Sequence, residues 1–204
     1  MKKLGVIILA AGASSRMGKP KLLLPWRGTT VIGHLLSQWQ ELGAAQIAVV
    51  LRANDSALAA ELDRLDFPKS DRIENPQPER GMFSSIVCAA DWNGWPAEVF
   101  NWAMVLGDQP HLKTETLRRL LKFSTQHQEA ICQPVFGGRT GHPVILPRTA
   151  FMELKSSGAA TGAATLKDFL KLVACRRVQL VINDPGLTLD MDTPEDYKRL
   201  TVFQ

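Results

Sequence analysis

The segment that follows the first apolar run of the chain is rich in residues that can bind an anion. Residues 11–21 have the sequence AGASSRMGKPK, in which Arg16, Lys19 and Lys21 are cationic. Small side chains allow a ligand to approach the backbone, glycine admits unusual dihedral angles, and exposed amide groups add hydrogen-bond donors. This composition is typical of a phosphate-binding loop, and it is also typical of an ordinary surface turn.

The position of this loop favours the phosphate-binding interpretation. Residues 4–10 form an apolar run that predicts a strand buried on both faces, as in a parallel sheet. The loop therefore follows the carboxyl end of a central strand, where open α/β sheets bind their ligands. It is not a Walker-type loop, because Pro20 follows Lys19, and the G-x-G-x-x-G fingerprint is absent. A dinucleotide oxidoreductase is therefore disfavoured.

Carboxylates that could hold a divalent metal ion come from two later segments. Asp108 follows the apolar run 102–106, which predicts another buried strand, and Asp190 and Asp192 precede a closing helix capped by Thr193 or Asp192. A lone Asp in such a turn is also typical of helix capping. Mg²⁺ takes oxygen ligands and commonly uses one or two carboxylates together with substrate phosphates. We therefore expect Asp108, with Asp190 or Asp192, to hold Mg²⁺.

Taken together, these segments resemble the MobA-like nucleotidyltransferase family. Residues 9–21, LAAGASSRMGKPK, are similar to its L-A-A-G-x-S-x-R-M-G-x-x-K signature. Further similar stretches follow in order: 75–85 (NPQPERGMFSS), 106–110 (LGDQP), 141–146 (GHPVIL) and 190–197 (DMDTPEDY). Within the family, the chain is most similar to the molybdenum cofactor cytidylyltransferases that serve molybdenum hydroxylases.

The resemblance implies both a fold and a reaction. The fold is an α/β three-layer αβα sandwich with a Rossmann-like, mostly parallel sheet, formed by residues 1–204 as a single domain. The reaction is the Mg²⁺-dependent transfer of CMP from CTP to the terminal phosphate of molybdopterin, with release of pyrophosphate. Ala11 implies CTP, because guanylyl members have Gly there, although one methyl group discriminates by only about 1–3 kcal/mol. A molybdenum hydroxylase that receives the cofactor is an implied partner.

The family likeness and the charges together assign roles to individual residues. Arg16 and Lys21 are expected to bind the β and γ phosphates, and Asp108 the metal at the α-phosphate. An attacking phosphate monoester has a second pKa of about 6 and needs no general base, in keeping with a sequence that offers no persuasive nucleophile–base pair. Base and ribose are expected to meet these residues: Leu9, Ala10, Ala11, Gly12, Gly81, Ser84 and Ser85.

Two further interpretations stay open. A sugar-phosphate or alditol-phosphate nucleotidyltransferase would use the same cations and carboxylates and would differ in its acceptor. A maturation chaperone for the molybdenum cofactor would keep the fold and bind nucleotide or pterin without releasing pyrophosphate.

Bulk composition narrows the class of protein. The chain has 204 residues, of which 45% are hydrophobic and 22% charged, as in a soluble single-domain protein. The net charge of +4 is scattered rather than clustered, so we expect anionic small molecules and no nucleic acid. No signal peptide and no apolar run of about 18 residues is evident, which predicts a cytoplasmic protein without a membrane segment. Cys88, Cys132 and Cys175 have no motif partner, so we expect core packing.

Several local predictions concern the edge of the expected site. Residues 137–141, GGRTG, predict a mobile flap over an anionic substrate, and residues 156–161 a small-residue linker at a substrate entrance. Residues 187–190 are expected to form a strand. Ser84 is either a helix cap or a ribose ligand, and His142 is interpreted as a structural donor rather than a catalytic residue.

Overall fold

β1 lies near the centre of an eight-stranded sheet, with the order β10-β7-β9-β6-β1-β4-β5 and with β8 paired to β7. The computed structural model describes residues 3–160, 165–173 and 176–202. The strands of the sheet are β1 (Lys3–Leu9), β4 (Gln46–Arg52), β5 (Arg72–Asn75), β6 (Val99–Leu106), β7 (Ile131–Phe136), β8 (Arg139–Thr140), β9 (Val144–Pro147) and β10 (Arg177–Val181). A separate hairpin consists of β2 (Pro25–Trp26) and β3 (Thr29–Thr30).

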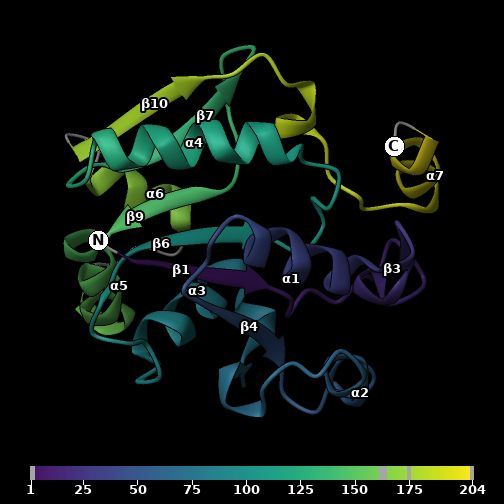
Figure 1. The fold of residues 1–204 in the computed structure, drawn as a ribbon. Helices are drawn as coiled ribbons and strands as arrows, with labels where there is room; N and C mark the ends of the chain where they lie inside the picture. Colours follow the sequence, from purple (N-terminus) through teal and green to yellow (C-terminus); the bar gives the residue numbers. More distant parts are fainter. Residues whose placement is uncertain (1–2, 161–164, 174–175, 203–204) are drawn as a thin grey trace.

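The strands that carry the site run parallel. β1 pairs in parallel with β4 and with β6, and β4 pairs in parallel with β5. β9 runs antiparallel to β6 and β7, while β10 is parallel to β7. The expected mostly parallel sheet is therefore confirmed. Because β1, β4 and β6 end at the same edge, the segments after residues 9, 52 and 106 lie close together (Figure 1).

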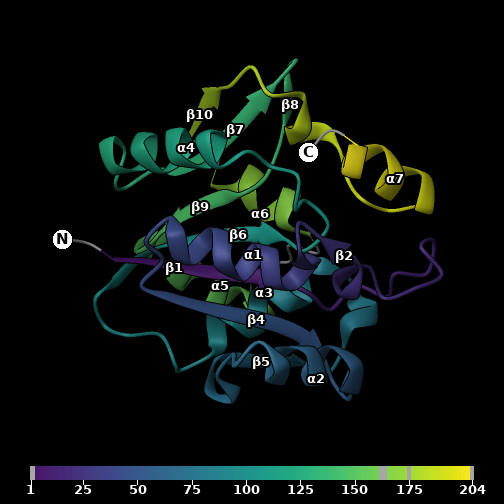
Figure 2. The same ribbon diagram turned by 45° about the vertical axis from the view of Figure 1, so that its right-hand side comes forward.

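Helices cover both faces of the sheet, as Figures 1 and 2 show. Val6 and Ile8 of β1 face a core shared with α1, α2, α4 and α7, and Ile7 faces a second core shared with α3, α5 and α6. The alternation follows from the two-residue period of a strand. The helices are α1 (Val31–Glu41), α2 (Ser56–Arg64), α3 (Met82–Asp91), α4 (Thr114–Gln126), α5 (Arg148–Ala160), α6 (Leu166–Leu172) and α7 (Pro194–Val202). The three-layer αβα sandwich is confirmed.

Side-chain caps fix the helices that flank the site. The side chain of Thr30 accepts a hydrogen bond from Gly33 N and begins α1, and Asp55 accepts one from Leu58 N and begins α2. Thr193 Oγ1 accepts a bond from the backbone N–H of Asp196, whose carboxylate accepts from Thr193 N in return. This reciprocal capping box determines where α7 begins.

The structure corrects four local predictions. Residues 137–141 form a tight β7–β8 hairpin rather than a flap, because Val135 pairs with Thr140 and Gly137 and Gly138 have positive φ. Residues 185–188 form a 3-10 helix, η5 (Pro185–Thr188), instead of the expected strand at 187–190. α5 continues to Ala160 through most of the predicted linker, and Thr161 lies outside the described residues. Gly81 rather than Ser84 is the N-cap of α3.

The cysteine predictions have three different outcomes. Cys132 is fully buried in the first core, which confirms its packing role. Cys88 is half-buried and packs against the second core. Cys175 lies outside the described residues. No helix in the described part of the chain is both long and apolar enough to cross a membrane.

Candidate active site

The basic loop turns sharply so that its two ends approach each other. Ser14 has φ of +50°, and its carbonyl accepts a hydrogen bond from Met17 N. Ser14 Oγ also accepts a bond of 3.2 Å from the backbone N–H of Lys21, which begins the 3-10 helix η1 (Lys21–Leu23). These two bonds fix the loop over the carboxyl end of β1 and direct Lys21 toward the end of β6.

Cations of the loop and carboxylates of the two distant segments meet in one ion-pair network. Lys21 Nζ lies 2.7 Å from Asp108 Oδ2 and 3.2 Å from Asp192 Oδ1. Arg16 Nη2 lies 2.8 Å from Asp192 Oδ2. The Lys21 side chain is only 14% exposed, whereas that of Arg16 is 70% exposed, so Lys21 is the cation enclosed by the site. Desolvation strengthens its interaction with the carboxylates relative to a surface pair.

The backbone holds the two acidic segments together. Asp108 follows β6, and its carbonyl accepts a hydrogen bond of 3.0 Å from Met191 N. The side chain of Met191 is fully buried and so anchors the backbone on which its neighbours Asp190 and Asp192 lie. The capping box of α7 begins at the next residue, Thr193, so the backbone position of Asp192 is fixed as well.

Asp190 lies in the field of the other carboxylates. Its Oδ1 accepts a hydrogen bond of 3.0 Å from the buried amide of Gln109. Burial raises the pKa of Asp190 above its ordinary value, the charge of Asp108 adds to the rise, and the Gln109 bond opposes it. Gln109 was not predicted from the sequence, although it is adjacent to Asp108 in the LGDQP segment. It acts here as the residue that orients Asp190.

The donor set suits a hard divalent cation shared with phosphates. Asp108 Oδ1 is buried and has no hydrogen-bond partner among the described residues, which leaves a carboxylate oxygen able to accept a ligand. No group of three or more His, Cys, Asp or Glu side chains in the described ranges forms a metal cage by itself. Mg²⁺ rarely uses such a cage and completes its shell with water and substrate oxygens, so the residues fit that ion.

A cavity of about 390 Å³ opens beside Asp108. Most of the residues that were expected to bind the nucleotide line it. We call it the nucleotide cavity. Neither Arg16 nor Ser84 lines it; the hydroxyl of Ser84 instead donates to the carbonyls of Gln77 and Gly81. The expected residues that line the cavity are Leu9, Ala10, Ala11, Gly12, Lys21, Gly81, Ser85 and Asp108.

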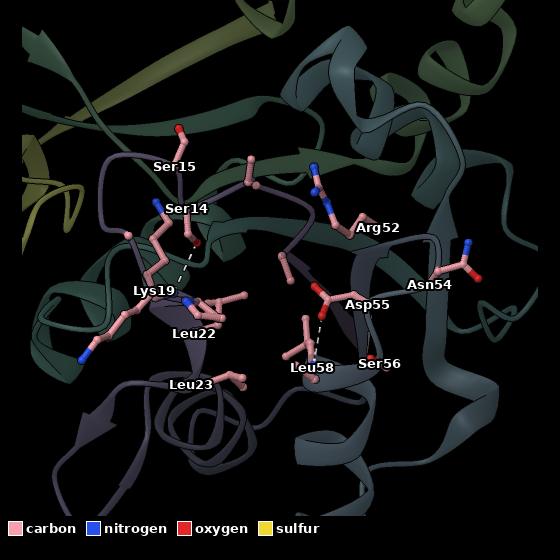
Figure 3. Close-up of a pocket in the computed structure, with 17 residues that line it drawn as sticks. Ser14, Ser15, Lys19, Leu22, Leu23, Arg52, Asn54, Asp55, Ser56 and Leu58 are labelled. Carbon is pink, nitrogen blue, oxygen red and sulfur yellow. Dashed lines mark hydrogen bonds between the residues drawn. The ribbon is translucent and has the colours of Figure 1, made fainter.

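A second cavity of about 470 Å³ adjoins the first on the side of α2. We call it the α2 cavity (Figure 3). The basic loop forms one wall and the segment from Arg52 to Leu58 forms the other. Arg52 lines both cavities and was not predicted. The available signal was its position as the first charged residue after the apolar run 47–51, at the same sheet edge as the loop.

The two histidines near the site, His111 and His142, are partly buried. Burial lowers the pKa of His142 and of His111, so both imidazoles are neutral at neutral pH. A ring nitrogen of His142 donates to Met104 O at 3.4 Å, and one of His111 to Gly186 O at 3.0 Å. The interpretation of His142 as a structural donor is in accord with this contact.

The fold and the site define a class: an α/β protein with a basic loop, a nucleotide-sized cavity and facing carboxylates at the carboxyl edge of a parallel sheet. The chain belongs to the family of MobA-like NTP transferase domains, which it matches over residues 6–180. It is 27% identical to the molybdenum cofactor cytidylyltransferase of Escherichia coli strain K12 over 200 residues, covering 97% of this chain and 95% of that protein.

Two further relatives of similar identity have different names. The nicotine blue oxidoreductase of Paenarthrobacter nicotinovorans is 30% identical over 202 residues, covering 95% of this chain and 94% of that protein. The crystal structure of Rv0371c from Mycobacterium tuberculosis H37Rv superposes with a TM-score of 0.75 at 28% identity, covering 98% of both chains. A manganese complex of Rv0371c superposes with a TM-score of 0.69 at 27% identity and 98% coverage of both chains.

Proposed function

We propose that the chain transfers CMP from CTP to the terminal phosphate of molybdopterin or the molybdenum cofactor, with release of pyrophosphate. The convergence of Lys21, Asp108 and Asp192 beside the nucleotide cavity is the observation that carries the proposal. Donors and carboxylates placed in this way can hold a triphosphate and a divalent ion together. The E. coli relative named molybdenum cofactor cytidylyltransferase supports this choice of donor and acceptor.

Binding of the nucleotide is assigned to the first half of the chain. Residues 9–12, together with Gly81 and Ser85, line the nucleotide cavity, where their backbone groups would contact base and ribose. Ala11 lines this cavity. A methyl group at this position, in place of the hydrogen of Gly, would favour the smaller pyrimidine base. That methyl provides about 1–3 kcal/mol of discrimination, so CTP is preferred without absolute exclusion of other nucleotides.

Charge neutralisation is the main contribution of the protein to the reaction. An oxygen of the acceptor phosphate forms a bond to the α-phosphorus, and the bond from that phosphorus to the bridging oxygen breaks, leaving the electron pair on pyrophosphate. Lys21 offsets the charge that develops there, and Arg16 adds a second cation next to Asp192. The acceptor phosphate is largely ionised at neutral pH, so no histidine or serine is required as a base.

Asp108, with Asp190 or Asp192, is proposed to hold Mg²⁺. When bound, the ion polarises the phosphoryl oxygens and neutralises part of the negative charge. The manganese complex of the Rv0371c relative supports a divalent ion in this fold. Gln109 contributes by keeping the Asp190 carboxylate in one orientation.

Pyrophosphate release from each of the four NTPs, with molybdopterin or with sugar and alditol phosphates as acceptors, tests the proposal. We expect release to require CTP and the pterin acceptor together. Release with an alditol or sugar phosphate instead would assign the first alternative. Binding of nucleotide or pterin without release of pyrophosphate would support the maturation chaperone. The proposed partner, a molybdenum hydroxylase, is then tested by adding the reaction product to its apo form and measuring whether the hydroxylase becomes active.

The oxidoreductase name of one relative makes redox chemistry the second candidate. Absence of a G-x-G-x-x-G fingerprint argues only against a Rossmann dinucleotide site, not against every redox reaction on this fold. Consumption of reduced nicotinamide nucleotides with aromatic acceptors, measured beside pyrophosphate release, separates the two candidates. Redox turnover without pyrophosphate would contradict the proposed transfer.

A further inference from the structure

Two cations of the site have no acidic partner. Lys19 and Arg52 line the α2 cavity, and neither forms an ion pair or a side-chain hydrogen bond within the described ranges. Arg16 and Lys21, in contrast, are both bonded to carboxylates. The guanidinium Nε of Arg52 is buried without a hydrogen-bond partner among these residues. A half-buried guanidinium with unused donors is suited to an anion.

The remaining polar groups of the α2 cavity include one carboxylate, that of Asp55. Asp55 is the acidic residue of its wall, and Oδ1 of Asp55 is used as the helix cap, accepting from Leu58 N at 3.0 Å. Ser15 and Ser56 add hydroxyl groups to the lining. Figure 3 shows Arg52 extending from the end of β4 across the hollow from Ser14 of the loop. Three cations, Lys19, Lys21 and Arg52, line the cavity with this one carboxylate, so the lining keeps a net positive charge.

The α2 cavity adjoins the nucleotide cavity at a wall that both share. Ser14, Lys21 and Arg52 line both of them. A nucleotide whose base lies near Gly81 and whose α-phosphate lies near Asp108 carries a flexible chain of two further phosphates. Those phosphates can extend past Arg52 toward Lys19, where unpaired positive charge is available, whereas the opposite side of the loop has Arg16 bonded to Asp192.

We infer that the α2 cavity is the subsite for the terminal phosphates of the nucleotide and for the pyrophosphate product, and that Arg52 and Lys19 are its binding residues. This inference rests on the proposed function for the identity of the ligand. It assigns to Arg52 and Lys19 a share of the phosphate binding that the sequence assigned to Arg16 and Lys21. It also predicts that the two cations distinguish a triphosphate from a monophosphate.

Calorimetric titration of the full chain with pyrophosphate, in the presence of Mg²⁺, tests the subsite without any acceptor. We expect Arg52→Ala and Lys19→Ala each to weaken pyrophosphate binding about tenfold or more, and Arg52→Lys to recover part of the loss. Binding of CMP should change less than about threefold. Arg118→Ala, which removes an exposed arginine of α4, is the matched control and should bind pyrophosphate like the wild type.

Two outcomes would overturn the inference: unchanged pyrophosphate affinity in both variants, or an equal loss for CMP and pyrophosphate. Pyrophosphate that binds without competing with CTP would assign the cavity to a phosphorylated acceptor and would also overturn it. Lys19 is exposed, so Lys19→Ala remains informative if Arg52→Ala fails to fold.

Failure of the subsite and failure of the proposed function can be told apart. If CTP and the pterin acceptor release pyrophosphate but Arg52→Ala leaves product inhibition by pyrophosphate unchanged, the function stands and the subsite is wrong. If no acceptor is active while pyrophosphate binding still depends on Arg52 and competes with CTP, the subsite stands and the reaction must be reassigned.

Discussion

Lys21 Nζ lies 2.7 Å from Asp108 Oδ2, although the two residues are 87 positions apart in the chain. The pair joins the end of β1, through its loop, to the end of β6. It therefore lies at the junction between the nucleotide cavity and the carboxylates that are proposed to hold a metal ion.

Replacement of Asp108 by Ala should lower turnover at least about a hundredfold, because it removes a proposed metal ligand at the α-phosphate. The fold should remain intact, as judged by circular dichroism and melting temperature, since the side chain is at the rim of the core. Asp108→Asn, which keeps the shape, should lose comparable activity. Asp91→Ala, on the exposed end of α3, is the control. Near-normal turnover in either Asp108 variant would remove this residue from the mechanism.

Replacement of Lys21 by Ala should weaken CTP binding about tenfold to a hundredfold, in keeping with the loss of a charge-assisted hydrogen bond of about 1.5–3 kcal/mol. CMP binding should fall less, because the proposed contact is with the outer phosphates. Fluorescence or calorimetric titrations with both nucleotides give the comparison, and Lys69→Ala removes an exposed lysine elsewhere as a control. Equal losses for CTP and CMP would contradict the role given to Lys21.

Replacement of Asp190 by Asn should stabilise the metal-free protein at neutral pH. The pKa of Asp190 is raised in the folded state, chiefly by burial and then by Asp108, so ionisation is less favourable in the folded than in the unfolded chain. The ionised group therefore destabilises the fold, and the penalty grows as the pH rises above the unfolded value of about 4. Asn removes this penalty while its Oδ1 still accepts from Gln109.

Thermal melts in a chelator at several pH values test this prediction. The gain of Asp190→Asn over the wild type should be present at pH 7 and should shrink toward pH 4. Asp91→Asn on the surface provides the comparison. A gain that is the same at every pH, or a loss at pH 7, would show that burial of the ionised carboxylate is not the cause.

Replacement of Gly107 by Ala should disturb the position of Asp108. A Cβ at Gly107 would lie 2.8 Å from Leu22 Cδ2 and 2.9 Å from the backbone oxygen of Leu9, which cannot easily move. We expect a loss of about 1–3 kcal/mol in unfolding free energy and a fall in turnover of tenfold or more. Gly12→Ala, whose Cβ would meet nothing within 4 Å, should melt near the wild-type temperature. Unchanged stability of Gly107→Ala would refute the tight contact.

Local pattern in the sequence was sufficient for most of the architecture. The apolar runs at residues 4–10 and 102–106 and the cap at Thr193 predicted two strands and a closing helix that the structure confirms. Caps and periodicity involve neighbours within about four residues, so one sequence records them directly. The prediction failed at residues 187–190, because the side chain of Asp184 accepts a hydrogen bond from Gly186 N and caps a 3-10 helix over residues 185–188 instead.

The sequence by itself determined the basic loop, the candidate carboxylates and the α/β alternation, because residue type and spacing encode them. Only the tertiary structure decided that Arg16 turns to Asp192, that Gln109 holds Asp190, and that Arg52 belongs to the site. The physical reason is that these contacts depend on strand order: β4 and β6 flank β1, so residues at their ends become neighbours irrespective of their separation along the chain.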